Sequence, residues 1–598
     1  MLADVLRKLL DLFTPAGRKQ AGRLLVMTVL VAVFEVIGVA SILPFISILA
    51  NPQVLETNAI LSSVKFWVGI ESNKHFNLLF GLLVFVMLVL SLSFKAITTY
   101  LQLKFILISE HNIGRRLVEG YLRQPYAWFL NRHSADLGKT VLSEVSVVVS
   151  GAIMPMMTLI SQALVAFAIL VLLIAVDVEL ALIVSVVLGC AYSLMYKAVS
   201  RYLVKIGREH KDANKQRFAA ISEVFAAVKE VKLYGLEDSY VSRFSRAAQI
   251  FAKHHASASV IAQVPRYFLE ALAFGGLLLV ILYLMASKGD FSEALPIISL
   301  YAFAGYRLMP ALQQTYASFS QLRFVGPELD GVHSELMSLS GEANVVLNSA
   351  PLKLGDSIEL RGVYFSYPNT SRYALENLSL SVPIRSTVAL VGATGCGKTT
   401  AIDLILGLLK PQKGVLAADD LQITDADMRR WQRVIGYVPQ QIYLSDDSIE
   451  ANIAFGVNAS EIDRAAVEAA ARIANIHDFI VDQLPDGYKT TVGERGVRLS
   501  GGQRQRIGIA RALYHRPQVL IMDEATSALD NITEQAVMEA IHNLSHKITI
   551  ILIAHRLSTV RECDLIYLME SGKVVAQGDF DHLLNECKEF QVLAQATA

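Results

Sequence analysis

A glycine-rich loop that ends in a lysine and a threonine is the part of this sequence best suited to chemistry. The segment GATGCGKT covers residues 392–399 and follows TVALV, an apolar run that predicts a buried strand. The glycines let the backbone bend so that its N–H groups point at phosphate oxygens. Lys398 can then reach the β- and γ-phosphates, and the Thr399 hydroxyl can bind Mg²⁺. The pattern predicts a site for ATP and Mg²⁺.

A second apolar run ends in two carboxylates. In VLIMDE (519–524), Asp523 and Glu524 follow directly after a predicted buried strand, which puts them at the carboxyl edge of a parallel sheet, where ligands bind. Asp523 is suited to holding Mg²⁺ through water and Glu524 to polarising an attacking water. Taken alone, the hexapeptide equally fits a strand end capped by acidic residues.

Composition places this ATP site on a membrane protein. The chain has 598 residues, of which 53% are hydrophobic, and its 54 Lys and Arg balance 54 Asp and Glu. The balance argues against a nucleic-acid partner, which requires a positive field. Apolar segments long enough to cross a bilayer lie near residues 23–50, 77–106, 142–176, 179–200, 257–287 and 294–324.

Basic residues set the orientation of these segments. The two long connections, near 105–141 and 197–253, are rich in Lys and Arg, so we expect them, both termini and the ATP site to be cytoplasmic. The predicted fold is a six-helix transmembrane domain followed by an α/β P-loop NTPase domain. The predicted boundaries are 1–22, an interfacial helix; 23–325, the transmembrane domain; 326–355, a linker; and 356–598, the nucleotide-binding domain.

Five motifs in a fixed order resemble the nucleotide-binding domain of ATP-binding cassette (ABC) transporters. They are GATGCGKT, Gln440 in GYVPQ, LSGGQRQR from residue 499, VLIMDEATSALD from 519 and AHRLST from 554. With six spans ahead of the cassette, the chain resembles an exporter half-transporter of the type IV fold. The resemblance implies a homodimer that hydrolyses ATP with Mg²⁺ at two composite sites.

The resemblance also implies a role for each matching residue. Glu524 and His555 are catalytic, and Glu494 and Asp530 lie in segments that transmit movement or cross the dimer interface. Thr399, Gln440 and Asp523 bind the metal ion. The ATP-binding residues are Tyr367, Gly392, Ala393, Thr394, Gly395, Cys396, Gly397, Lys398, Thr399, Thr400 and Gln440. The signature residues, which bind the partner's ATP, are Leu499, Ser500, Gly501, Gly502 and Gln503. The handles that carry movement to the membrane are expected near 124–132 and 231–238.

Charged residues inside the predicted spans point to the substrate, because they are costly in a membrane. Lys95, Arg266 and Arg307 outnumber Glu35 and Glu270 and would suit an anionic head group. Pairing with the two glutamates, or extension of Lys95 toward the interface, is the alternative.

Stretches in three spans, such as FEVIGVASILPFISIL, resemble PglK-type flippases. This implies movement of a polyprenyl-pyrophosphate-linked oligosaccharide to the outer leaflet of a bacterial inner membrane. An exporter of peptides or hydrophobic drugs remains an alternative, as does a nucleotide-gated channel or regulator. The four cysteines have no metal-site or disulfide spacing.

Overall fold

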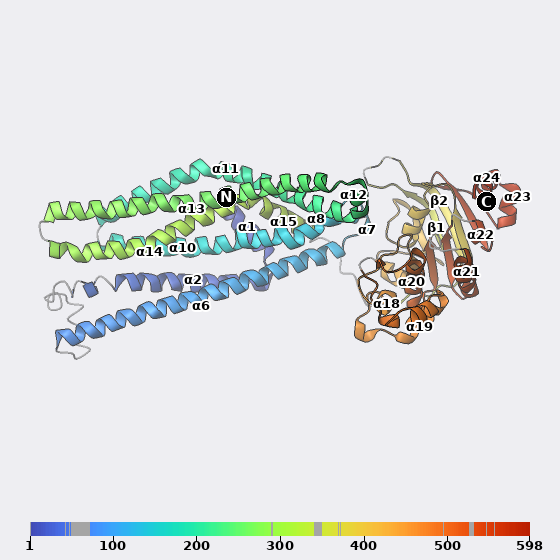
Figure 1. Cartoon of the computed structure of the whole chain (residues 1–598), viewed down its shortest axis with the longest axis horizontal. Coiled ribbons are helices and arrows are strands. Elements are labelled where there is room, and N and C mark those ends of the chain that lie inside the picture. Colours follow the sequence, from blue (N-terminus) through green and yellow to red (C-terminus); the bar gives the residue numbers. More distant parts are fainter. Residues whose placement is uncertain are drawn as a thin grey trace. The chain divides into compact units, whose positions relative to one another are not determined.

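The chain divides into a helical unit and a cassette unit. The computed structural model describes residues 2–41, 44–46, 48, 72–176, 178–288, 291–339, 350–368, 370, 372–493, 496–524, 531–545, 547–554 and 557–597. The helical unit comprises 1–124 and 131–342, and the cassette unit comprises 343–598 together with 125–130 (Figure 1). A helical membrane domain followed by a P-loop domain is therefore confirmed.

Long helices build the first unit. They are α1 (Leu2–Leu12), α2 (Pro15–Ala40), α6 (Asn73–Leu122), α8 (Ser134–Lys139), α9 (Val145–Val148), α10 (Met154–Val176), α11 (Val178–Ala226), α12 (Val228–Tyr234), α13 (Glu237–Lys288), α14 (Phe291–Phe324) and α15 (Gly326–Ser338). Two π-helical turns, Thr140–Glu144 and Val149–Ile153, join α8, α9 and α10 into one continuous helix.

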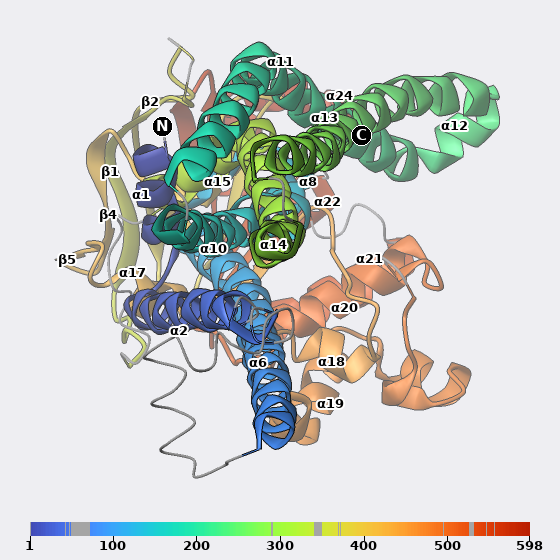
Figure 2. The same ribbon diagram turned by 90° about the vertical axis from the view of Figure 1, so that its left-hand side faces the viewer.

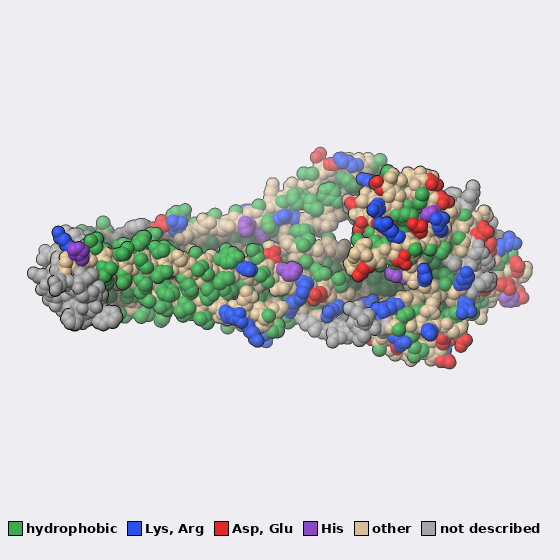
Figure 3. All heavy atoms as spheres, turned by 90° about the horizontal axis from the view of Figure 1, so that it is seen from below, with side chains coloured by type: hydrophobic (Ala, Val, Ile, Leu, Met, Phe, Trp, Pro, Cys, Tyr) green, Lys and Arg blue, Asp and Glu red, His purple; other side chains and the backbone are tan. Residues whose placement is uncertain are grey.

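Several of these helices are longer than a bilayer is thick. The 50 residues of α6 span about 75 Å, against a hydrocarbon core of about 30 Å. Four helical stretches among the described residues are long and apolar enough to cross a membrane: Pro15–Ile46, Lys74–Leu122, Ser134–Val176 and Ala181–Ala226. Hydrophobic side chains cover much of the helical surface, as Figure 3 shows. Such a surface is stable only against lipid or other protein.

The helices pack around α10 and α14. These two lie side by side, with α11 and α13 on one side and α2 and α6 on the other (Figure 2). Buried side chains such as Ile169 on α10 and Leu300 on α14 form the shared core. A Cβ atom at Gly207 of α11 would lie 2.1 Å from the carbonyl oxygen of Phe324, so only glycine permits this close approach to the end of α14.

Two segments differ from the expected boundaries. The predicted linker begins with a helix, α15, whose Leu329, Val332 and Leu336 are buried in the helical unit. The short helix α7 (Tyr126–Phe129), which the chain places between α6 and α8, groups with the cassette. Both differences follow from tertiary packing of apolar side chains, which a change in local composition does not reveal.

Two sheets form the cassette. One is antiparallel with strand order β2-β1-β4-β5, and the other is mostly parallel with order β10-β9-β3-β8-β7-β6. The strands are β1 (Ser357–Phe365), β2 (Leu375–Pro383), β3 (Thr387–Val391), β4 (Lys413–Ala418), β5 (Leu421–Gln422), β6 (Ile435–Val438), β7 (Val519–Asp523), β8 (Thr549–Ile553), β9 (Leu565–Glu570) and β10 (Lys573–Gly578).

The cassette helices are α16 (Lys398–Ile405), α17 (Met428–Gln432), α18 (Ile449–Ile453), α19 (Arg464–Ile473), α20 (Gly501–Tyr514), α21 (Asn531–Ser545), α22 (Leu557–Val560), α23 (Phe580–Glu586) and α24 (Lys588–Thr597). Successive residues of β3 face two different cores: Ala389 packs in one and Leu390 in the other. Because β3 is covered on both faces, the loop that follows it starts from a rigid base.

Candidate functional site

The predicted phosphate loop joins β3 to α16. Two of its glycines are required by both conformation and space. Gly392 has φ 148° and Gly397 has φ 108°, in the region that L side chains rarely adopt. A Cβ atom on Gly392 would also lie 2.2 Å from the carbonyl oxygen of Met569, and one on Gly397 would lie 2.9 Å from that of Ala374. The loop is therefore held close to neighbouring backbone, with the start of α16 at its end.

Lys398 lies inside this loop. Its buried ammonium donates to the carbonyl oxygens of Gly392 at 2.7 Å and Ala393 at 3.1 Å. These bonds keep a positive charge at the centre of the loop, where the phosphates of a nucleotide would be bound. The hydroxyl groups of Tyr367 and Thr400 are 3.0 Å apart, so the aromatic residue expected at the adenine lies against the first turn of α16.

The two predicted carboxylates lie at the end of β7, which pairs with β8 in the parallel sheet. Asp523 is buried and ends the strand. Glu524 comes next with φ 49°, an unusual conformation for a residue with a side chain. Such a backbone costs about 1–3 kcal/mol and persists only where its surroundings enforce it.

Three contacts enforce the position of Glu524. Its backbone N–H donates to the carbonyl oxygen of Ile553 at 3.3 Å, and its own carbonyl oxygen accepts from Nε2 of Gln505 at 3.2 Å. Its carboxylate accepts from Nε2 of Gln440 at 2.7 Å. A carboxylate held this way can orient and polarise a water molecule.

The signature segment caps helix α20. Ser500 is the N-cap, and its hydroxyl oxygen accepts from the backbone N–H of Gln503, whose side chain in turn accepts from the backbone N–H of Ser500. The hydroxyl hydrogen of Ser500 is left to donate to an anion, and the helix N-terminus adds its positive end. Arg504 fixes the preceding turn by donating to the carbonyl oxygen of Leu499 at 2.8 Å.

The residues expected to hold Mg²⁺ offer the oxygen atoms that this ion prefers. They are the Thr399 hydroxyl, the Gln440 amide oxygen and the Asp523 carboxylate. Burial, together with the negative charge of Asp523, raises the pKa of Asp403 on α16 to about 6. A cation beside Asp523 would offset this concentration of negative charge. The donor set therefore fits a magnesium ion that also binds ATP phosphates.

Three predicted residues, His555, Asp530 and Glu494, lie outside the described residues. Conversely, two residues close to the site were not predicted. Gln505 lies within the LSGGQRQR motif, but the resemblance assigned roles only to its first five residues, and Asp403 lies one turn beyond Thr400, the last residue of the predicted ATP-binding segment. The helical spacing of Asp403 from the end of the loop is the signal that could have identified it.

Helix α7 occupies the first predicted handle and packs on the cassette. Ala127 contacts the core that contains β3. Burial and the nearby charge of Asp403 raise the pKa of Tyr126, so the phenol lies near α16. Helix α12 occupies the second handle, where Leu233 and Tyr234 are exposed just before Gly235, whose positive φ ends the helix.

The charged residues of the spans form two separate groups. Glu35 of α2 is buried and lies 2.5 Å from the ammonium of Lys95 on α6 and 4.0 Å from the guanidinium of Arg307 on α14. Arg266 pairs instead with Glu270, one turn along the same helix, at 2.7 Å. The predicted pairing with Glu35 and Glu270 is thus present. The group around Glu35 therefore contains two cations, Lys95 and Arg307, and one carboxylate.

Comparison with known proteins identifies both parts of the chain. A family model described as "ABC transporter" matches residues 375–527, and one described as "ABC transporter transmembrane region" matches residues 5–304.

Related proteins match over most of their length. An "ATP-dependent lipid A-core flippase" of Ralstonia nicotianae is 32% identical over 79% of this chain and 80% of its own. The "Heterocyst differentiation ATP-binding protein HepA" of Nostoc is 31% identical over 80% of this chain and 78% of its own. The solved structure of a bacterial Atm1-family ABC exporter with ATP bound has the same fold, with a TM-score of 0.78 and 23% identity over 97% of this chain and 98% of its own.

Proposed function

Because this chain belongs to the ABC transporter family and couples ATP hydrolysis to transport, we propose that two copies flip an anionic lipid from the cytoplasmic to the outer leaflet. The proposed substrate is a polyprenyl-pyrophosphate-linked oligosaccharide. Relatives named as lipid A-core flippases support a lipid substrate. The observation that carries the anionic head group is the cluster of Lys95 and Arg307 around one buried carboxylate, Glu35.

In the proposed homodimer, the phosphate loop of one chain and Ser500 of the other bind the same ATP. Mg²⁺, when bound, would neutralise charge on the phosphates, with Thr399, Gln440 and Asp523 as its protein partners. Glu524 orients the attacking water, and His555 contacts the γ-phosphate. Hydrolysis removes the γ-phosphate contact that joins the two cassettes, so the dimer opens.

Movement reaches the membrane through the two short helices. Helix α7 packs on the cassette of the same chain. A shift of α16, or of the segment that contains Gln440, therefore moves α7 with it. The exposed side chains of Leu233 and Tyr234 on α12 offer an apolar contact for the cassette of the second copy. Both termini and the cassette lie in the cytoplasm of a bacterial inner-membrane protein under this proposal.

The head group would bind where cations exceed anions. Glu35 offsets one positive charge while the site is empty of substrate, which lowers the cost of placing Lys95 and Arg307 among apolar helices. A pyrophosphate can accept hydrogen bonds from both cations, and Arg307 can do so with two N–H groups at once. Arg266, the third cation predicted for the head group, lies in a separate pair with Glu270, which offsets its charge, so we do not place it in the proposed site.

A flipping assay in proteoliposomes tests the substrate. We expect Lys95→Ala and Arg307→Ala each to lower ATP-driven flipping of a polyprenyl-pyrophosphate glycan at least tenfold, while transport of a neutral hydrophobic drug, if any, is unchanged. Arg266→Ala serves as the matched control, because it removes a cation whose partner lies on its own helix. If Lys95→Ala and Arg307→Ala flip the glycan as fast as Arg266→Ala does, the proposed head-group site is refuted.

A second arm of the assay tests whether the substrate is the polyprenyl-linked glycan or another anionic lipid. Lipid A-core is supplied in place of the polyprenyl-linked glycan, at the same density in the vesicles. Flipping of lipid A-core alone would keep the cation cluster as a head-group site and would replace the proposed substrate. Flipping of both would show that the site recognises the phosphate and not the lipid chain.

A further inference from the structure

An apolar cavity lies under the N-terminal helix. It has a volume of about 280 Å³ and is bounded by α1, the first turns of α2, α6 and the start of α10. Its lining includes Leu9 and Phe13 from the N-terminal segment, Phe105 from α6 and Met156 from α10. Apolar cavities of about 150 Å³ already stay dry and accept apolar molecules. This cavity is therefore suited to a hydrocarbon chain and not to water.

The lining of the cavity has few polar side chains, those of Thr28 and Arg18. Thr28 has its partners within the protein, because its hydroxyl donates to the carbonyl oxygen of Leu24 at 2.9 Å and accepts from Gln102 at 3.0 Å. Arg18 is the charged residue of the lining, and its side chain is 51% exposed. A ligand of this cavity would thus meet hydrocarbon throughout and one cation at the rim.

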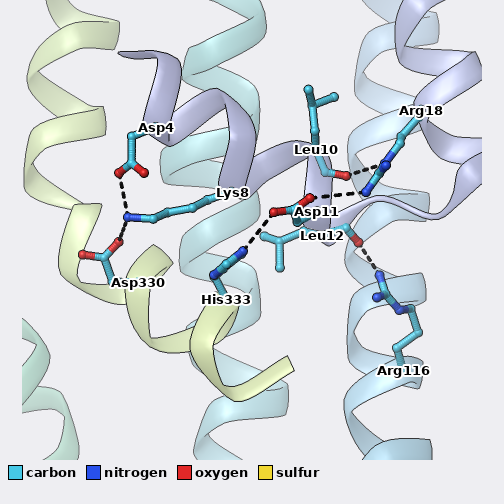
Figure 4. A network of polar contacts seen from close by, with 9 residues as sticks. All are labelled: Asp4, Lys8, Leu10, Asp11, Leu12, Arg18, Arg116, Asp330 and His333. Carbon is cyan, nitrogen blue, oxygen red and sulfur yellow. Dashed lines mark hydrogen bonds and ion pairs between the residues drawn. The ribbon is translucent and has the colours of Figure 1, made fainter. Parts of the chain in front are cut away.

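Arg18 belongs to a network of polar contacts around the junction of α1 and α2. The Nε atom of Arg18 donates to the carbonyl oxygen of Leu10 at 2.7 Å, and its Nη2 atom lies 3.4 Å from Oδ1 of Asp11. Arg116 of α6 donates to the carbonyl oxygen of Leu12 at 2.5 Å (Figure 4). Two guanidinium groups thus lie where α1 ends and α2 begins, and the half-exposed guanidinium of Arg18, although paired with Asp11, can still donate to a phosphate.

The position of α1 places the cavity at a membrane surface. Leu2, Leu6 and Leu10 form an exposed apolar stripe along one side of the helix, and Val5 and Leu9 are buried on the adjoining side. A helix with such a wide apolar face and with Asp and Lys opposite lies in the interface between head groups and hydrocarbon. Leu6 and Leu10 are exposed and also line the cavity, so a lipid chain can enter from beside α1.

We propose that this cavity binds one acyl chain of an anionic phospholipid of the cytoplasmic leaflet, with its phosphate at Arg18. The site lies apart from the cation cluster around Glu35 and does not depend on which substrate is flipped. Its effect would reach α15, because Lys8 lies 3.0 Å from Asp330 and Asp11 lies 3.3 Å from His333 (Figure 4). A bound lipid that fixes the position of α1 would therefore also stabilise α15, the helix that precedes the cassette in the chain.

The structure offers a variant that fills the cavity without a clash. Gly22 lines it, and a Cβ atom there would meet nothing within 4 Å. Gly22→Leu should occupy the space of the acyl chain, and leucine is also a better helix former than glycine. Ala21→Leu is a second filling variant on the same wall. Gln20→Leu is the matched control, since it adds the same side chain at an exposed position outside the lining.

The test counts lipids that remain bound. The full-length transporter is extracted with mild detergent from vesicles of phosphatidylcholine and phosphatidylglycerol, and native mass spectrometry gives the number of each lipid per chain. We expect Gly22→Leu and Ala21→Leu to lose one phosphatidylglycerol per chain, and Gln20→Leu to keep it. Thermal unfolding of each variant verifies that the protein is folded. Retention of the wild-type number by folded Gly22→Leu and Ala21→Leu would overturn the proposal.

Arg18→Gln tests the charged end of the site separately. We expect this variant to keep one bound lipid per chain but to lose the preference for phosphatidylglycerol over phosphatidylcholine at least fivefold. An unchanged preference would overturn the assignment of the phosphate to Arg18. A flipping assay that failed for every glycolipid would refute the proposed transport substrate and leave these lipid counts unaffected.

Discussion

Gln505 is expected to control catalysis although it touches neither nucleotide nor metal ion in the proposed mechanism. Its side chain is buried and its Nε2 atom donates to the carbonyl oxygen of Glu524. Gln505→Met removes this donor while keeping the length of the side chain. The carbonyl oxygen of Glu524 then loses a partner at a residue whose backbone is already in an unfavourable conformation.

The size of the effect follows from the lost hydrogen bond. The loss of one intramolecular hydrogen bond costs about 0.5–1.5 kcal/mol, and Glu524 is then freer to relax toward an ordinary backbone conformation. Relaxation moves the carboxylate away from the water that it orients. If this cost falls entirely on the transition state, kcat decreases about 2-fold to about 12-fold. The KM for ATP should change little, because the loop of residues 392–400 is not altered.

Gln518→Met provides the matched control. The amide of Gln518 also donates to a backbone carbonyl oxygen, that of Leu352 at 2.8 Å, but it lies just before β7, at the opposite end of this strand from Glu524. Phosphate release is measured over a range of ATP concentrations for both variants in the same lipid. A kcat for Gln505→Met equal to that of Gln518→Met, or a loss that appears only in KM, would refute the reasoning.

Two further predictions concern the same site. Glu524→Gln keeps the shape of the side chain but cannot act as a base, so ATP hydrolysis should fall by about 100-fold or more while ATP binding, measured by equilibrium dialysis, is retained. Asp403 has a pKa raised to about 6 from 3.8, so the native state binds more protons than the unfolded state between these values and stability decreases as pH rises through them. Asp403→Asn should therefore raise the melting temperature at pH 7 more than at pH 4, and an equal change at both values would show that Asp403 does not titrate in this range.

Local sequence was enough to predict the phosphate loop and the strand-end carboxylates. A glycine-rich turn between a buried strand and a helix is determined by backbone conformation within about ten residues, and the structure places Lys398 and Thr399 at the end of that turn. Asp523 ends a fully buried strand and Glu524 follows it. In both cases the chemistry depends on neighbours along the chain, so motif and spacing carry the information.

Long-range contacts could not be predicted in the same way. The pairing of Lys95 with Glu35 joins residues 60 positions apart, and sequence reasoning offered it only as an alternative to a substrate role. The contact between Gln505 and Glu524 depends on how α20 packs over β7. The grouping of α7 with the cassette depends on Ala127 and Tyr126 packing against an apolar surface that is more than 220 residues away in the chain.

Helix α20 links the two halves of the proposed composite site. Ser500 caps the N-terminus of the helix and Gln505 lies about 7.5 Å further along it, so the two move as one rigid body. In the proposed homodimer, ATP on the partner subunit draws Ser500 toward its γ-phosphate, and the same shift repositions the donor that fixes Glu524. Occupation of one ATP site would thus favour the catalytic geometry of the other. Because Gln505→Met breaks this link without altering Ser500, it should lower the cooperativity of hydrolysis with respect to ATP as well as kcat.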